Sequence, residues 1–137
     1  MKRKYIVLGF TIAIVVIGIF SMKFFLGIKP FKNLSILDIS SVSVNLLPAD
    51  TTIELNRREI QELVDVLKTI IIYKKDNSYR DYAGQAVIFI IAKTDGSKIT
   101  INAYNPFIII DGSGYRTKYE PCEKLNTLGN AISQASE

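Results

Sequence analysis

Histidine is absent from this chain of 137 residues, and cysteine occurs only once, as Cys122. Without histidine the chain has neither a Ser-His-Asp nor a Cys-His nucleophile system, and no imidazole that changes charge near neutral pH. A single cysteine cannot close an internal disulfide, and the two shortages together exclude the common Cys/His zinc sites. We therefore expect no metal, no cofactor and no catalytic residue of these classes. For Cys122 we expect an inert, partly buried thiol rather than an exposed one that pairs with another chain.

Acidic residues are absent from residues 1–34, which carry six lysines and arginines. The rest of the chain has eleven basic and thirteen acidic residues, so the high isoelectric point of about 9.2 comes from the N-terminal segment. Basic residues that flank a membrane span set its orientation and contact lipid headgroups. Because the remainder of the chain has no basic excess, we expect no nucleic-acid partner.

Charge is also absent from Tyr5 to Met22, a run that reads YIVLGFTIAIVVIGIFSM. As a helix these 18 residues are about 27 Å long, close to the roughly 30 Å of a bilayer's hydrocarbon core. Lys2, Arg3 and Lys4 directly precede the run. The pattern predicts a single transmembrane helix that contacts the lipid bilayer through residues 5–26.

A cleaved signal peptide also begins with basic residues and an apolar run. This run is longer than the usual h-region, and Lys23, Phe24, Phe25 and Leu26 follow it in place of a small-residue cleavage site. We expect an uncleaved signal anchor in residues 1–26 of a cytoplasmic-membrane protein, with the N-terminus inside and the C-terminal domain outside. Lys23 and Lys29 oppose this orientation, but a large trailing domain translocates largely regardless of its charge.

Residues 27–35 include Pro30 and several polar positions, and we interpret them as a short stalk. Residues 36–137 have the length of one compact domain. Apolar and polar residues alternate over residues 36–47, with a slip at Ser40-Ser41 that predicts a strand with a bulge. A short second strand is predicted for residues 51–55.

Two helices are predicted in this domain. Apolar residues recur at helical spacing from Ile60 to Ile71, and Asn56 with Glu59 forms a capping-box-like pair in front of them. This pattern predicts an amphipathic helix over residues 56–71. A narrower apolar stripe and Pro121 in the first turn predict a C-terminal helix over residues 121–134.

Four further strands are predicted between the two helices, and they form a meander. They cover residues 85–93, 98–104, 107–110 and 115–119, separated by turns rich in glycine, asparagine and aspartate. The first of them is almost entirely apolar, which is typical of a central strand covered on both faces. The predicted fold class is α+β, a mostly antiparallel sheet of five or six strands with the 56–71 helix packed on one face.

The polar connection over residues 74–84 is the best candidate for a partner-binding surface. It contains Tyr79, Arg80 and Tyr82, and tyrosine and arginine are frequent at interface hot spots. The alternative is a connection whose tyrosines pack their rings on the edge of the sheet.

Asp111 is the candidate for a catalytic carboxylate. The apolar run into Ile110, Asp111, Gly112, Ser113 and Gly114 resembles the turn that holds the catalytic aspartate of aspartic proteases. The resemblance covers these few residues, Gly112 intrudes between Asp111 and Ser113, and the chain has no second such motif, so a dimer would have to supply the other carboxylate. An ordinary hairpin turn is the alternative interpretation.

These observations predict a small membrane-anchored extracytoplasmic protein that binds an envelope protein or a ligand and has no catalytic activity. One alternative is a carboxylate-dependent hydrolase centred on Asp111. Another is an immunity or inhibitor protein that acts at the membrane.

Overall fold

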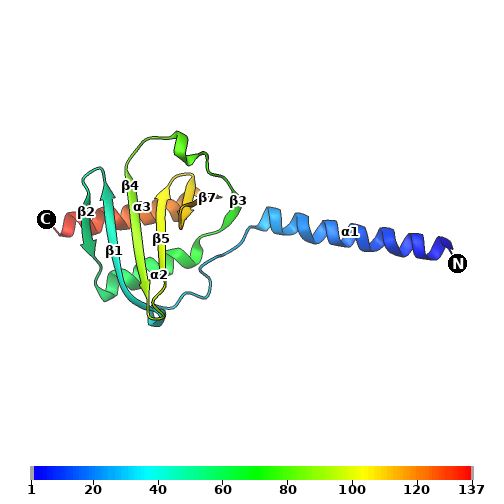
Figure 1. Ribbon diagram of the computed structural model, residues 1–137, viewed down its shortest axis with the longest axis horizontal. Helices are drawn as coiled ribbons and strands as arrows, with labels where there is room; N and C mark the ends of the chain where they lie inside the picture. The colour runs from blue at the N-terminus through cyan, green and yellow to red at the C-terminus, as the bar shows by residue number, and fades with distance from the viewer. Residues whose placement is uncertain (1, 137) are drawn as a thin grey trace.

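The computed structural model of the protein describes residues 2–136, except for the side chains of Lys23 and Phe24. Its fold is α+β: a seven-stranded antiparallel sheet carries two helices on one face, and a long N-terminal helix projects from the side (Figure 1). The elements follow in this order: α1 (Lys2–Leu26), η1 (Ile36–Asp38), β1 (Ile39–Leu47), β2 (Thr51–Glu54), α2 (Arg57–Thr69), β3 (Ile72–Lys75), η2 (Ser78–Asp81), β4 (Ala86–Lys93), β5 (Lys98–Tyr104), β6 (Phe107–Ile110), β7 (Ser113–Thr117) and α3 (Tyr119–Ala135).

The strands lie in the order β2-β1-β4-β5-β6-β7-β3, and neighbouring strands are antiparallel. The predicted meander is confirmed as β4 to β7. The sheet has one strand more than the five or six expected because no strand was predicted over β3, which pairs Ile72 with Thr117. The predicted bulge in β1 is confirmed by a shift of register between Ile39 and Ser41.

The core lies between the sheet and the two helices α2 and α3. Val44, Phe89, Ile101 and Ile110 stand in register across β1, β4, β5 and β6, and the first three of these side chains are completely buried. The helices contribute buried residues to the same cluster. They are Leu63, Val64 and Leu67 from α2, and Cys122, Leu125, Leu128 and Ile132 from α3.

The predicted capping box of α2 is confirmed. The Asn56 side-chain oxygen accepts hydrogen bonds from the backbone N–H groups of Arg58 and Glu59, each at 3.0 Å. In return, the Glu59 carboxylate accepts one from the Asn56 N–H at 2.7 Å. These bonds satisfy donors that have no partner within the helix, so they fix where α2 begins.

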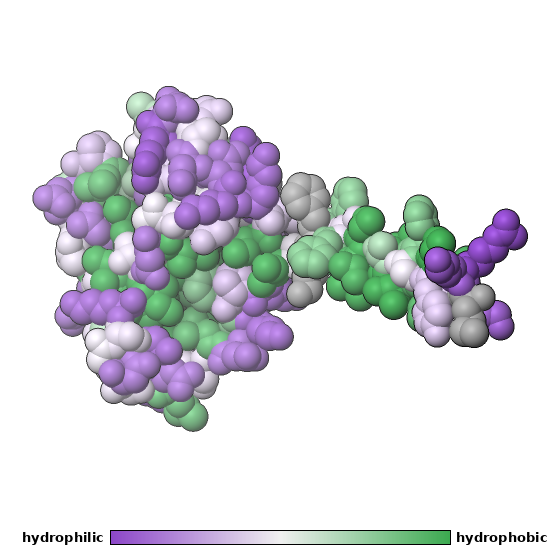
Figure 2. Space-filling model, turned by 45° about the vertical axis from the view of Figure 1, so that its right-hand side comes forward, coloured by the Kyte–Doolittle hydropathy of each residue, from purple (hydrophilic) through white to green (hydrophobic). Residues whose placement is uncertain are grey.

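Within residues 2–136 no α-helix covers the other face of the sheet. Phe89 and Ile91 of β4 are buried on the helix side, whereas Ile88 and Ile90 are only half-buried on the opposite side. The prediction that β4 is covered on both faces is therefore wrong for this opposite face. Figure 2 shows hydrophobic atoms at the surface of the globular part, between polar margins.

The helix α1 is apolar on all sides. All of its described side chains are exposed, so none of them belongs to the hydrophobic core. Its segment Lys2–Met22 is long and apolar enough to cross a membrane, by length and composition. In Figure 1 the helix stands clear of the sheet. A helix that is hydrophobic all round and unburied by its own protein needs an apolar environment from elsewhere.

Residues 27–35, the predicted stalk, lie against the domain. Ile28 and Ile72 exchange two backbone hydrogen bonds of 2.8 Å, which add a bridge to the free edge of β3. Phe31 and Leu34 are buried in the core, at 5% and 9% exposure. The chain therefore passes from α1 into the sheet almost without a spacer.

Candidate functional site

A groove with a volume of about 670 Å³ lies between α2 and α3. Val66 of α2 and Leu128, Ala131 and Ile132 of α3 supply its apolar surface. We call this concavity the α2–α3 groove. It lies on the outer side of the two helices, because their inner sides pack on the sheet.

Carboxylates outnumber cations around the α2–α3 groove. A second hollow on α2 adjoins it and shares Arg58, Glu62, Val66 and Lys124 with it. The charged residues that line the two hollows are Glu59, Glu62, Asp65, Glu120 and Glu123, against Arg58 and Lys124. The groove thus combines an apolar floor with a rim of negative charge.

Several of the rim carboxylates are held in place by neighbours. Lys124 forms an ion pair of 2.9 Å with Glu120, one turn before it on α3, and its hydrogen bond lowers the pKa of that carboxyl group. The side-chain amide of Asn105 donates to Glu123 at 3.0 Å. Glu59 belongs to the cap of α2. Contacts with neighbouring residues therefore hold rim carboxylates on both helices in a defined geometry.

No local pattern in the sequence predicts this groove. The polar residues of α2 were interpreted only as the solvated face of an amphipathic helix, which is the usual meaning of such a pattern. The pattern of one helix does not reveal which part of that face a second helix will approach. A clue was available in the small residues Ala131 and Ala135, which lie on α3 and line the groove.

The predicted partner-binding residues lie on a segment that crosses the open face of the sheet. This segment, residues 76–82, is here called the strap. The rings of Tyr79 and Tyr82 pack against Phe107 of β6, at centroid distances of 6.3 and 5.9 Å. Tyr79 is half-buried, and its hydroxyl donates to the Gly112 carbonyl at 3.1 Å. Tyr79 thus packs its ring on β6, inside the sheet and not at the edge that the alternative interpretation named, whereas Arg80 and Tyr82 are exposed.

The strap is tied to β7 by charge and by hydrogen bonds. Arg116 donates to the Asp76 carboxylate at 2.8 Å, and its guanidinium lies 4.4 Å from the centre of the Phe107 ring. This bond and those from Ser78 hold the pKa of Asp76 well below its usual range. The Asn77 side chain accepts from the Gly114 N–H at 2.8 Å. The strap thus covers β6 and β7 on the open face of the sheet. Its role as a partner-binding site stays a prediction.

Asp111 lies in the turn between β6 and β7, away from the α2–α3 groove. Its backbone has a positive φ of 49°, and its carboxylate accepts a hydrogen bond from the Thr100 N–H at 2.8 Å. The Asp111 N–H in turn donates to the Thr100 carbonyl at 2.9 Å. These bonds extend the pairing of β5 with the turn, as the hairpin interpretation expects. A carboxylate-dependent hydrolase centred on Asp111 stays an untested prediction. The alternative of an immunity or inhibitor protein that acts at the membrane is likewise untested.

Cys122 is completely buried at the start of α3. Its thiol donates to the Phe107 carbonyl at 3.3 Å, and burial raises its pKa to about 12. The thiol therefore stays protonated and is inaccessible to another chain, as expected for an inert cysteine.

Within residues 2–136 no group of three or more carboxylate and cysteine side chains is placed to hold a metal ion. Comparison of the chain with protein-family models, with curated proteins and with solved structures finds no match. The proposals below therefore rest on the geometry of this chain.

Proposed function

We propose that this chain is a non-catalytic binding protein of the cytoplasmic membrane, with its N-terminus inside and its α+β domain outside. The α2–α3 groove is its binding site, and a basic amphipathic helix of another envelope protein is the partner. The observation that carries this proposal is the combination of an apolar floor with an acidic rim in one groove between two helices.

The membrane part of the proposal is supported by α1. Its described side chains are exposed, and the length and composition of Lys2–Met22 fit a bilayer's hydrocarbon core. Lys2, Arg3 and Lys4 at its start favour a cytoplasmic N-terminus.

The partner chemistry follows from the shape and charge of the α2–α3 groove. An amphipathic helix binds such a groove by laying its apolar face on the floor, so Val66, Leu128 and Ile132 would contact that face. Lysine or arginine side chains at the margins of the partner helix would then meet the carboxylates of the rim. Complementary charges of this kind favour the correct partner and speed its association.

The test uses the full chain in detergent micelles and two synthetic peptides of about 18 residues, which as helices are about 27 Å long. Both peptides carry leucine and alanine on one face; the polar face of one is lysine and that of the other is glutamate. We expect the basic peptide to bind at least about tenfold more tightly, measured by fluorescence anisotropy, since tenfold is about 1.4 kcal/mol. Equal affinities for the two peptides would contradict the proposal.

A matched pair of variants locates the binding. Ala131 is exposed and lines the groove, so Ala131→Arg fills the groove with a long cationic side chain without removing a core residue. Gln134→Arg places the same side chain on an exposed position of α3 that does not line the groove. We expect only Ala131→Arg to weaken the basic peptide, by about tenfold or more. If the two variants bind it equally well, the peptide lies elsewhere.

A further inference from the structure

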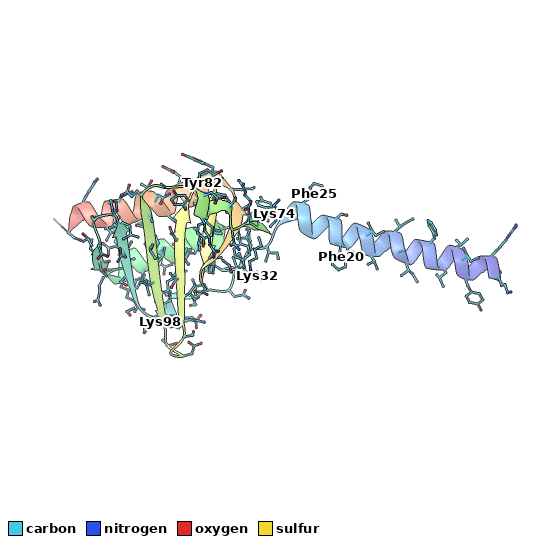
Figure 3. The ribbon with its side chains drawn as sticks, turned by 45° about the horizontal axis from the view of Figure 1, so that its top comes forward. Phe20, Phe25, Lys32, Lys74, Tyr82 and Lys98 are labelled. Carbon is cyan, nitrogen blue, oxygen red and sulfur yellow. The ribbon has the colours of Figure 1, made fainter. Side chains whose placement is uncertain are left out.

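The part of the domain nearest to α1 carries four exposed lysines. Lys29 and Lys32 follow the helix, and Lys74 and Lys75 end β3; we call these four the juxtamembrane lysines. The ion pairs among residues 2–136 are formed by Lys93, Arg116 and Lys124, so none of the four has a carboxylate partner. Figure 3 shows Lys32 and Lys74 at the end of the domain from which α1 departs, whereas Lys98 lies at the tip of the β4–β5 hairpin.

The joint between α1 and the domain keeps these lysines close to the end of the helix. Gly27 has a positive φ of 69°, and a Cβ at this position would collide with the Ile71 side chain and with the Ile72 carbonyl oxygen. Ile28 is bonded to Ile72 through both of its backbone groups. Because β3 is hydrogen-bonded to the chain directly after α1, there is no long linker between the helix and the domain.

The two segments that meet at this joint, residues 27–35 and β3, carry charge of one sign. Residues 27–35 and β3 contain no acidic residue, and Asp76, the first one after β3, is already paired with Arg116. The potential of an anionic bilayer surface falls off within a Debye length, about 8 Å at physiological ionic strength. The juxtamembrane lysines belong to the two segments that meet at the end of α1, whereas Lys98 lies at the tip of the β4–β5 hairpin, away from α1.

We propose that the juxtamembrane lysines bind anionic lipid headgroups and thereby hold the β3 edge of the domain on the bilayer. This inference rests on the proposed insertion of α1. The domain would then have a fixed orientation on the bilayer. Because α3 ends on the side of the domain opposite to α1 (Figure 1), the end of the α2–α3 groove formed by the C-terminal part of α3 would face away from the bilayer.

The experiment reconstitutes the full chain into two kinds of vesicle, one of equal parts phosphatidylglycerol and phosphatidylcholine and one of phosphatidylcholine alone. Lysine acetylation by a water-soluble reagent is then followed residue by residue by mass spectrometry. We expect the juxtamembrane lysines to react at least about fivefold more slowly in the anionic vesicles. Lys98 is the internal control, and its rate should be the same in both. High salt should abolish the difference, because it screens exposed charges.

A variant with Lys32→Gln, Lys74→Gln and Lys75→Gln gives a second measurement. In anionic vesicles Lys29 should then react about as fast as in neutral ones, whereas a Lys98→Gln control should keep Lys29 slow. Extraction with alkaline carbonate distinguishes a failure of the headgroup contact from a failure of α1 to insert into the bilayer. Chain that stays in the vesicles with equal acetylation rates in both lipids overturns the headgroup contact alone. Chain that is extracted overturns the insertion of α1 as well.

Discussion

The two faces of the sheet are covered by different means. On one face α2 and α3 bury a continuous apolar layer, in which Phe89 and Ile101 have no exposed surface. On the other face only the strap covers β6 and β7, through rings packed on Phe107 and the ion pair of Asp76 with Arg116. The first cover depends on burial of apolar area, and the second depends on a few directional contacts. We therefore expect the two faces to respond differently to substitution and to pH.

The largest effect is expected on the helix-covered face. Phe89→Ala should lower the free energy of unfolding by about 3–5 kcal/mol, because it opens a cavity in the buried layer. The matched change on the open face is Ile90→Ala, at the next position of β4 and half-buried. Ile90→Ala should lower the free energy of unfolding by about 1 kcal/mol, because a half-buried side chain buries less apolar area than Phe89 does. Urea unfolding of the full chain in micelles measures both. Equal losses would mean that the open face is as well packed as the other.

The next effect concerns the contact between the strap and the sheet. A Cβ at Gly114 would collide with the Asp76 carbonyl oxygen and with the Tyr79 ring. Gly114→Ala should therefore cost about 1–3 kcal/mol by overpacking. Hydrogen exchange should also become faster at the Asp76 N–H, which donates to the Gly114 carbonyl at 2.8 Å.

Gly112→Ala is the control for this substitution, since a Cβ there has no neighbour within 4 Å. Its cost, about 1–2 kcal/mol, comes from the positive φ of 80°. Exchange at Asp76 should stay slow in this variant. If both variants speed it equally, the strap does not depend on close approach to Gly114.

The smallest effect is expected from the charge of Asp76, and it depends on pH. Because its pKa is lowered in the folded chain, the ion pair stabilises the fold above the unfolded value of about 3.9. That contribution is lost as the pH falls below this value towards the folded pKa. Asp76→Asn should therefore lower Tm modestly at pH 7, and the difference from the original chain should shrink towards pH 2.

Asp81→Asn is the control, because Asp81 is exposed and has no side-chain hydrogen bond or ion pair among residues 2–136. Its Tm should match that of the unmodified chain across the same pH range. A constant Tm difference for Asp76→Asn at all pH values would show that shape, and not charge, holds the strap.

Most of the fold follows from local patterns. The capping pair of Asn56 and Glu59, the helical spacing behind it and the alternating strands of the meander each involve neighbours in the sequence, so each was predicted close to its true position. The strand β3 was missed because it has four residues, two of them lysines, and forms by pairing Ile72 with Ile28 and Thr117. Those partners lie more than 40 residues away on either side.

The candidate site was less predictable for the same reason. The sequence pointed to Tyr79, Arg80 and Tyr82 as the exposed aromatic and basic group, and the structure uses Tyr79 to cover Phe107. The acidic rim of the α2–α3 groove joins Glu59 and Glu62 to Glu120 and Glu123. These pairs of residues stand about 60 positions apart, and no local pattern relates them.

The sequence by itself determined the apolar N-terminal helix, the sign and place of its flanking charges, and the order of the helices and of the strands other than β3, because these depend on composition and short-range periodicity. Only the tertiary structure decided which face of the sheet is covered, that Phe31 and Leu34 belong to the core, and that the chain after α1 is bonded to β3. Such features depend on contacts between distant segments, and those contacts form only when the whole domain packs.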